Sequence, residues 1–366
     1  MSGKRALSIE GLAGDVCPCT GLAFSGYHAA CAMADGQAAQ HDGEWQMTVS
    51  SGEGLVTIFG GSGFVGRHVV RALARRGYRI RVAVRRPDLA FHLQPIGSVG
   101  QIHAVQANVR NRASVDRAVA GADAVINLVG ILCESGRQRF DAVQDFGARA
   151  VAQAAAKAGA DKLVQISAIG ADADSDSAYA RSKAAGEAGA LAAFPGAVII
   201  RPSVVFGPED HFFNQFAAIA RFSPVVPVLG TAKFQPVFVG DVAEAIACTI
   251  DGRAAAGTVY ELGGPEVATF HDLMELMLEV IGRRRLLVPV PLGVARLKAT
   301  FLQLLPKPLL TVDQVRLLGH DNVVSDAALR DRRTLEGLGI EPRSMRIILP
   351  TYLERFRPVG PVEIAA

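Results

Sequence analysis

The sequence lacks long apolar runs, is poor in cysteine and has almost no excess charge, and each shortage excludes a class of protein. Because it contains no stretch of about 18 consecutive apolar residues, we expect no transmembrane helix, although peripheral contact with a membrane stays open. The net charge is only +3, and the charged residues are spread along the chain, so charge gives no support for a nucleic-acid partner. Half of the 366 residues are apolar, which is enough for one large or two modest domains.

The five cysteines do not have the spacing of a metal site. Cys17 and Cys19 form a C-x-C, but a structural metal site needs a second close Cys or His pair, which His28 and His41 do not supply convincingly. Unpaired thiols in a reducing compartment are therefore the favoured interpretation, and we predict no metal site.

The chain changes character after its first segment. Residues 1–52 mix small residues, cysteine and scattered acids without a helical or strand period, and they match neither a secretory signal nor a transit peptide. We expect a disordered leader, or a start assigned too far upstream with Met47 as the natural start. We then predict a nucleotide-binding domain over residues 53–206, a smaller domain over 207–345 from which some elements return to the first, and a tail over 346–366.

From Leu55 onwards, short apolar runs alternate with helical stretches. The runs predicted as strands are Leu55–Phe59, Arg79–Val84, Ile102–Val105, Ala124–Val129, Leu163–Ile166 and Val198–Ile200. Strands that alternate with helices imply parallel βαβ units, so the predicted fold is α/β, a Rossmann-type doubly wound parallel sheet. After residue 207 the alternation weakens, and we expect a smaller, partly helical C-terminal domain in which Asp241 and Thr269 cap two helices.

A glycine-rich loop follows the first predicted strand and opens the first helix. Its residues are Gly60, Ser62, Gly63, Phe64, Val65 and Gly66, in a G-x-x-G-x-x-G pattern. Without side chains the backbone can turn tightly and approach a pyrophosphate, and the helix N-terminus adds free N–H groups and a favourable dipole. Because strand, loop and helix come in the required order, we predict a dinucleotide site; the alternative is a tight turn without a ligand.

Two arginines stand where the second strand ends. An NAD-specific site usually has Asp or Glu there for the ribose hydroxyls, whereas this chain has Arg85 and Arg86. Guanidinium groups pair well with a 2′-phosphate, so NADPH is the predicted cofactor; the alternative is a pair of solvated surface charges. The wall of the site is expected to add Asn108 and Val109 at the adenine, and Leu128, Val129 and Gly130 at the sugars.

A tyrosine and a lysine four residues apart share one helix face, at Tyr179 and Lys183. A neighbouring ammonium lowers the pKa of a phenol and makes it a usable general acid or base, and the lysine can also hold the nicotinamide ribose. Ser167, just after the fifth strand, can polarise a carbonyl. A Y-x-x-x-K pattern alone is common by chance, but after six β/α units in order it is fairly specific for a catalytic set.

These motifs resemble the short-chain dehydrogenase/reductase superfamily in its extended or atypical branch, although Asn108 replaces the Asp that is often found there. Arg201-Pro202 and Val239–Ala243 are further matches, and Pro202 is expected to contact the cofactor. Finer patterns resemble one family, the NADPH-binding accessory subunit of respiratory complex I, of alphaproteobacterial type. They are Gly60–Arg67, Val84–Pro87, Arg201–Asp210, Phe213-Asn214, Leu310–Leu318 and Asp321–Ser325.

In that family the nucleotide is held tightly and no turnover is established. The resemblance implies a role in stabilising the junction of the peripheral and membrane arms, with peripheral-arm subunits near the quinone site as partners. It also implies a place on the cytoplasmic face of a bacterial inner membrane. Tyr179 and Lys183 then become cofactor contacts first and catalysts second, although the intact Ser, Tyr and Lys set keeps enzyme activity open.

A basic region in the C-terminal half supports docking. Residues 282–320 hold seven arginines and lysines against a single acid, Asp313, and apolar residues interleave with Arg296 and Lys298. The stretch is too short to span a bilayer, but a basic amphipathic helix can lie on lipid headgroups or on a partner. The alternative is an ordinary helix packed on its own domain with a solvated basic face.

Two other functions stay open. A free-standing NADPH-dependent reductase or an epimerase of the extended type keeps the same tyrosine and lysine. An epimerase also needs a pocket for a nucleotide diphosphate, for which the second domain has no distinctive run. A redox-sensing regulator needs different affinities for the reduced and the oxidised cofactor.

Overall fold

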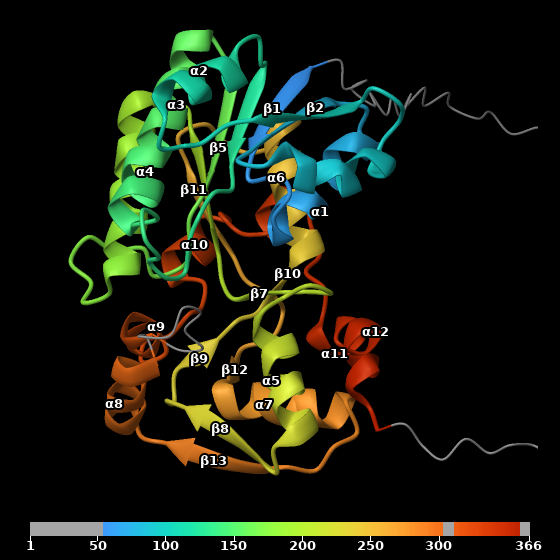
Figure 1. The fold of residues 1–366 in the computed structure, drawn as a ribbon, viewed down its shortest axis with the longest axis vertical. Helices are drawn as coiled ribbons and strands as arrows, with labels where there is room; N and C mark the ends of the chain where they lie inside the picture. The colour runs from blue at the N-terminus through green and yellow to red at the C-terminus, as the bar shows by residue number, and fades with distance from the viewer. Residues whose placement is uncertain (1–53, 303–310, 359–366) are drawn as a thin grey trace, which may run out of the picture. The chain divides into compact units, whose positions relative to one another are not determined.

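The computed structural model describes residues 54–302 and 311–358. Its main sheet has seven parallel strands in the order β11-β6-β5-β4-β1-β2-β3 (Figure 1), which confirms the predicted doubly wound α/β fold. The strands are β1 Leu55–Phe59, β2 Arg79–Val84, β3 Ile102–Gln106, β4 Ala124–Asn127, β5 Lys162–Ile166, β6 Val198–Pro202 and β11 Val259–Leu262. The order reverses beside β1, and such a reversal opens a crevice at the carboxyl ends of the strands.

Helices cover both faces of this sheet (Figure 1). One face carries α1 Phe64–Arg75 and α6 Val239–Ile250, and the other carries α2 Arg112–Val119, α3 Phe146–Ala158 and α4 Ala178–Ala193. Because side chains alternate along a strand, Val56 and Ile58 of β1 are buried under α1 and α6, whereas Phe59 belongs to the core under α2 and α3. Shorter segments on this part are η1 Pro87–Ile96 and η2 Asp141–Asp145.

A second apolar core lies in the C-terminal half. Its helices are α5 Phe212–Phe222, α7 Phe270–Val280, α11 Met345–Ile348 and α12 Pro350–Leu353, with η4 Glu354–Phe356. Three two-stranded sheets join it: β7 Val205–Phe206 with β10 Val237–Phe238, β9 Lys233–Phe234 with β12 Ala268–Thr269, and β8 Val225–Leu229 with β13 Leu286–Val290. Phe212, Phe216 and Phe270 meet edge to face, with ring centroids 5.4–5.6 Å apart. Such pairs add specific geometry to ordinary burial.

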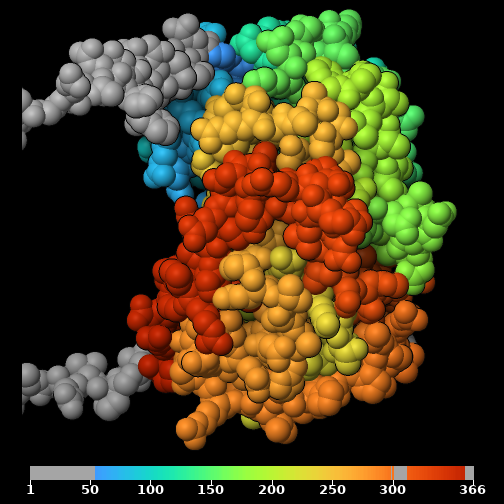
Figure 2. Space-filling view, turned by 180° about the vertical axis from the view of Figure 1, so that it is seen from behind, coloured from blue at the N-terminus to red at the C-terminus, as the bar shows by residue number. Residues whose placement is uncertain are grey.

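The chain passes between the two cores several times. β11 pairs with β6 in the main sheet although the sequence did not suggest a strand there, and α6 packs against α1. The segment expected to be a tail contributes Leu349, Tyr352 and Leu353 to the second core. Figure 2 shows the last described residues, in red, lying across the surface formed by earlier segments.

The two predicted caps have different outcomes. Thr269 caps α7, because its side chain accepts a hydrogen bond from the Asp272 amide and Asp272 bonds back in a capping box. Asp241 does not cap α6, which begins at Val239; its carboxylate instead accepts a hydrogen bond from the Arg343 amide at 2.8 Å. A contact between residues about a hundred positions apart therefore replaces the local one.

The remaining helices lie between the cores or beside the second one. They are α8 Leu292–Leu302, α9 Val312–Leu317, α10 Asp326–Arg330 and η3 Glu336–Leu338. Ala295 and Ala299 of α8 share a small apolar core with Leu229 and with Val315 of α9. Across the two described ranges, no helix is both long enough and apolar enough to cross a membrane.

The packing of the last helices predicts an asymmetric response to truncation of two neighbouring side chains. Leu349 is fully buried, whereas Ile347 is 69% exposed. We expect Leu349→Ala to lower the free energy of unfolding by about 2–5 kcal/mol through lost burial and a residual cavity. Ile347→Ala should change it by less than about 0.5 kcal/mol. Denaturant unfolding of both variants measures this, and equal losses would contradict the packing described.

Candidate nucleotide site

The glycine loop after β1 depends on the absence of side chains. Gly60 has φ +79°, a left-handed conformation that suits glycine. A Cβ at Gly66 would overlap the carbonyl oxygen of Gly60 and the backbone of Gly61. The Gly63 amide closes the turn with a hydrogen bond to Gly60 O at 3.0 Å. The loop thus lets α1 begin directly against the end of β1.

The start of α1 leaves backbone donors free. Its N-cap is Gly63, which offers no side-chain acceptor, and its first turn holds no acid. The Arg67 amide bonds to Gly63 O, so the amides of Phe64, Val65 and Gly66 precede the helix's own hydrogen-bond ladder. Free N–H groups and the positive end of the helix dipole together favour an anion such as a pyrophosphate.

A cavity of about 650 Å³ opens at the carboxyl ends of β1, β2, β3 and β4, a volume typical of small-molecule sites. The predicted residues that line it are Gly60, Ser62, Gly63, Arg85, Arg86, Asn108, Val109, Leu128, Val129 and Gly130. The predicted residues outside its lining are Phe64, Val65, Gly66, Ser167, Tyr179, Lys183 and Pro202. The sequence pattern therefore predicted most of one wall of the cavity correctly, whereas Tyr179 and Lys183 do not line it.

Three guanidinium groups stand around this cavity. Arg85 donates to the neutral side chain of Gln138 at 2.8 Å, so its charge has no acidic partner in that bond. Arg86 pairs with Asp88 at 2.9 Å, and both side chains are largely exposed. Arg110 also lines the cavity and was missed from the sequence. The signal that could have found it is a basic residue directly after the Asn108-Val109 pair.

Lys183 brings the second half of the predicted set to the cavity wall. Its Nζ lies 5.7 Å from the centre of the Tyr179 ring, one helical turn away on α4. A Cβ at Gly130 would lie 3.3 Å from the same Nζ, so the ammonium sits against a residue that lines the cavity. The ring of Tyr179 also meets Phe140 edge to face at 6.0 Å. The pair is thus placed beside the cavity, with Tyr179 held by its neighbours.

Burial shifts the pKa values of this pair apart. It raises the pKa of Tyr179 to about 12, against the expectation that the neighbouring ammonium would lower it. It lowers the pKa of Lys183 to about 8, an effect that the nearby Glu187 carboxylate partly opposes. Desolvation penalises whichever form is charged, and it is the largest cause of both shifts. The phenol is therefore neutral at pH 7, and the lysine is close to its titration range.

Ser167 follows β5 and is 5% exposed. Its amide donates to Ile200 O at 2.7 Å, but its hydroxyl has no partner among the described residues. An unsatisfied buried hydroxyl costs about 1–3 kcal/mol, so its persistence points to a missing hydrogen-bonding partner. The free amides of α1 and the glycine loop fit the pyrophosphate of a bound dinucleotide, whereas Ser167 is not among the residues that line the cavity.

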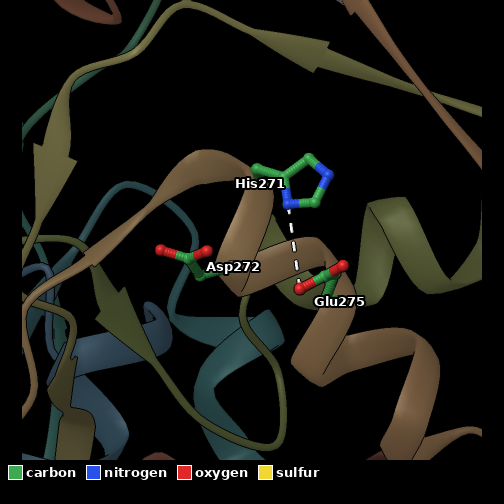
Figure 3. A group of neighbouring side chains, drawn as sticks. All are labelled: His271, Asp272 and Glu275. Carbon is green, nitrogen blue, oxygen red and sulfur yellow. Dashed lines mark ion pairs between the residues drawn. The ribbon is translucent and has the colours of Figure 1, made fainter.

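One group of side chains has the composition of a metal site. Figure 3 shows His271 and Glu275 facing each other one turn apart on α7, with Nδ1 and Oε2 3.8 Å apart. Asp272 completes the group, but its carboxylate accepts hydrogen bonds from the amide and hydroxyl of Thr269. All three side chains are exposed. A surface ion pair beside a helix cap explains the arrangement without an ion.

The lowered pKa of Lys183 predicts a stability gain in alkali. Between pH 8 and 10 the folded protein loses this proton while the unfolded chain, with a lysine pKa of 10.5, keeps it. The unfolded state then binds more protons, so the free energy of unfolding should rise with pH, by about 2–3 kcal/mol over the window. Tyr179 opposes this only above pH 10, where an unfolded tyrosine ionises.

The measurement is denaturant unfolding at several pH values, for the parent protein and for Lys183→Met. Subtracting the two curves removes the contribution of every other titrating group. If the difference between the two free energies of unfolding stays constant from pH 8 to 10, Lys183 is not desolvated as described.

Comparison with known proteins identifies the fold and the family. Residues 56–263 match the NAD dependent epimerase/dehydratase family. An epimerase structure from Methanothermobacter thermautotrophicus is similar with a TM-score of 0.64 at 18% identity, covering 84% of this chain and 93% of that one. MoeE5, solved in complex with UDP-glucuronic acid and NAD, is similar with a TM-score of 0.61 at 19% identity, over 82% and 98% of the two chains. At such identities the likeness shows the fold alone.

Curated relatives are more similar in sequence. The mitochondrial NADH dehydrogenase (ubiquinone) 1 alpha subcomplex subunit 9 of Arabidopsis thaliana is 34% identical over 327 residues, which is 85% of this chain and 80% of that protein. The mouse protein of the same name is 34% identical over 84% of this chain and 82% of its own length. The ceramide reductase of Caulobacter vibrioides is 38% identical, but over only 52% of this chain and 59% of that protein. The chain therefore belongs to the NAD dependent epimerase/dehydratase family and is a homologue of the complex I alpha subcomplex subunit 9.

Proposed function

We propose that this protein is an NADPH-binding accessory subunit of NADH:quinone oxidoreductase, in which the nucleotide is a resident structural group. The observation that carries the proposal is the match to alpha subcomplex subunit 9 over at least four fifths of both chains. Its role is to stabilise the junction of the peripheral and membrane arms. Its place is the cytoplasmic face of a bacterial inner membrane, bound peripherally to the arm near the quinone site.

The residues around the cavity can hold each part of NADPH. The free amides at the start of α1 suit the pyrophosphate, and Arg85, which has no acidic partner in its bond to Gln138, suits the 2′-phosphate. Lys183 can donate to the nicotinamide ribose from beside Gly130. When bound, NADPH supplies a hydride, but holding it requires none of these residues to transfer a proton.

The raised pKa of Tyr179 argues against a role as general base. A general acid or base works best when its pKa lies near the working pH. Tyr179 has a pKa raised to about 12, because burial disfavours the phenolate. At pH 7 the phenolate fraction is then on the order of one in 10⁵. The neutral phenol can donate a hydrogen bond to a nucleotide or substrate oxygen, which serves binding without turnover.

The helix α8 supports peripheral docking. Ala295 and Ala299 pack inward, whereas Val294 and Leu297 are 45% and 63% exposed. Arg296 between them is also exposed. An outward face with exposed apolar and basic side chains suits a protein partner or a headgroup surface. We assign this contact to the exposed face of α8, which lies within the basic stretch of residues 282–320.

A free-standing reductase is the second candidate function. The observations that favour it are the intact Ser167, Tyr179 and Lys183 set and the similarity to a ceramide reductase over half of the chain. In that case the neutral phenol of Tyr179 would donate a proton to a carbonyl oxygen of a ceramide-type lipid. The same cavity would then exchange its nucleotide at every cycle.

The proposed function predicts co-purification from membranes. A tagged chain, solubilised in mild detergent and purified under native conditions, should bring down subunits of NADH:quinone oxidoreductase. Nucleotide extracted from the purified complex should be NADPH in a near one-to-one amount with the chain. Mass spectrometry of the proteins and chromatography of the nucleotide measure both.

A different result would favour the second candidate. A chain recovered without respiratory subunits, which oxidises NADPH with a ceramide-type substrate and stops doing so in Tyr179→Phe, would overturn the proposal. Salt-washed membranes serve as the control for adhesion through the basic region, because a purely electrostatic contact is screened at high ionic strength.

The cofactor preference predicts a selective effect of Arg85→Ala. Loss of a charge-assisted contact with the 2′-phosphate should raise the Kd for NADPH by roughly 10- to 100-fold and leave the Kd for NADH nearly unchanged. Arg79→Ala is the matched control, because Arg79 is exposed at the opposite end of the same strand. Fluorescence titration of the nucleotide-free protein measures both constants, and equal losses for the two nucleotides would refute a role in phosphate recognition.

A further inference from the structure

The helix that carries Tyr179 and Lys183 begins on a carboxylate from a distant part of the chain. Asp313 of α9 accepts three hydrogen bonds at the start of α4: from Ser177 Oγ at 2.9 Å, from the Ala178 amide at 2.9 Å and from the Tyr179 amide at 3.0 Å. Figure 1 shows α9 below the lower end of α4, where that helix begins. The two elements are more than 130 residues apart in sequence, so this contact is a tertiary one.

Asp313 completes the hydrogen bonding of the first turn of α4. The N-cap residue Ser177 is fully buried, and its hydroxyl accepts from the Ala180 amide at 3.3 Å while it donates to Asp313. The first three amides of the helix, which have no partner within it, are therefore all satisfied by two side chains. A carboxylate at this position also faces the positive end of the helix dipole.

The clasp, by which we mean Asp313 with Ser177, Ala178 and Tyr179, fixes the Tyr and Lys end of the candidate site. Tyr179 is the second residue of α4, so its backbone is bonded to Asp313 directly. Lys183 follows one turn later and reaches the cavity wall at Gly130. A shift at the start of α4 would therefore move both side chains relative to the cavity.

The helix α9 also packs on α8, which carries the proposed docking surface. Val315 is fully buried in the small core that α9 shares with Ala295 and Ala299 of α8. Arg316, one residue further, donates to Asp176 O at 3.1 Å, next to the clasp. The short helix α9 is thus bonded to α4 through Asp313 and packed on α8 through Val315.

We propose that Asp313 is a positioning residue through which the α8–α9 pair controls the placement of Tyr179 and the affinity of the nucleotide site. A displacement of α9 on α8 would withdraw the carboxylate from the start of α4 and weaken nucleotide binding. This inference rests on the proposed function, because it concerns the regulation of that nucleotide site. Reciprocal coupling of this kind follows from thermodynamic linkage.

The test uses the full chain with Asp313→Ala, Asp313→Asn and a matched control, Asp272→Ala. Asp272 accepts comparable hydrogen bonds at the start of α7, a helix that packs in the second core and does not contact α4 through this residue. Both alanine variants lose a helix cap, but only Asp313→Ala loses the clasp. Amide hydrogen exchange should become roughly tenfold faster at the start of α4 in Asp313→Ala and stay unchanged there in Asp272→Ala. Asp313→Asn, which keeps one acceptor oxygen, should lie between.

Two readouts separate positioning from ordinary capping. With ¹³C-labelled tyrosine, the ring signal of Tyr179, assigned by its loss in Tyr179→Phe, should shift in Asp313→Ala without any ligand. The Kd for NADPH should rise roughly tenfold in the same variant and stay unchanged in Asp272→Ala. Faster exchange with an unmoved ring signal and an unchanged Kd would overturn the proposal and leave Asp313 as a cap only.

Val315→Ala tests the link to α8 while Asp313 itself is intact. Loosening the small core should speed exchange at the start of α4 and shift the Tyr179 ring signal in the same direction as Asp313→Ala. A variant that unfolds only α8 and α9, with Tyr179 unmoved, would refute the coupling. If NADPH fails to bind even the parent protein, the proposed function fails, but the ring signal still decides whether Asp313 positions Tyr179.

Discussion

The close approach of α1 to the loop after β1 is the contact on which the site depends. Gly66 lies so near the backbone of Gly60 and Gly61 that any side chain would force the helix outward. With no side chain there, α1 begins at the point where the strand order of the sheet reverses, and its free amides face the carboxyl ends of the strands. The same placement packs Val69 and Leu73 on the sheet. The hydrophobic core and the nucleotide site therefore both require a residue without a side chain at position 66.

Local sequence was enough for six of the seven strands of the sheet and for one wall of the cavity. Period and spacing located six strands and the glycine loop, because strand, turn and helix signals act over a few residues. The features that were missed depend on contacts between distant segments: β11, which pairs with β6, and the hydrogen bonds of Asp313 to the start of α4. The predicted Asp241 cap was wrong for the same reason, because Asp241 bonds to Arg343. The predicted direction of the Tyr179 pKa shift was also wrong. The sequence shows the lysine one helical turn away, but the burial that raises the pKa is set by the whole fold.

Asn322, in the C-terminal part of the chain, bonds to both of the loops that follow β5 and β6. Asn322 accepts a hydrogen bond from Ser203 Oγ at 2.6 Å and donates to Ile169 O at 3.3 Å, two residues after Ser167. Near it, Arg201 of β6 forms a two-pronged ion pair with Glu187 of α4, at 2.9 and 2.6 Å. The motifs that resembled the accessory-subunit family after residue 310 thus contact the nucleotide-binding part and build no separate domain of their own.

The Arg201 pair also explains why the lysine beside the cavity stays close to its titration range. Glu187 is the carboxylate nearest in sequence to Lys183 on α4, and it favours the charged ammonium, but both of its oxygens are already bonded to Arg201. An acid committed to a guanidinium stabilises a second cation weakly, so desolvation dominates and the pKa of Lys183 falls to about 8. A bound anionic nucleotide would supply the missing negative charge and raise that pKa.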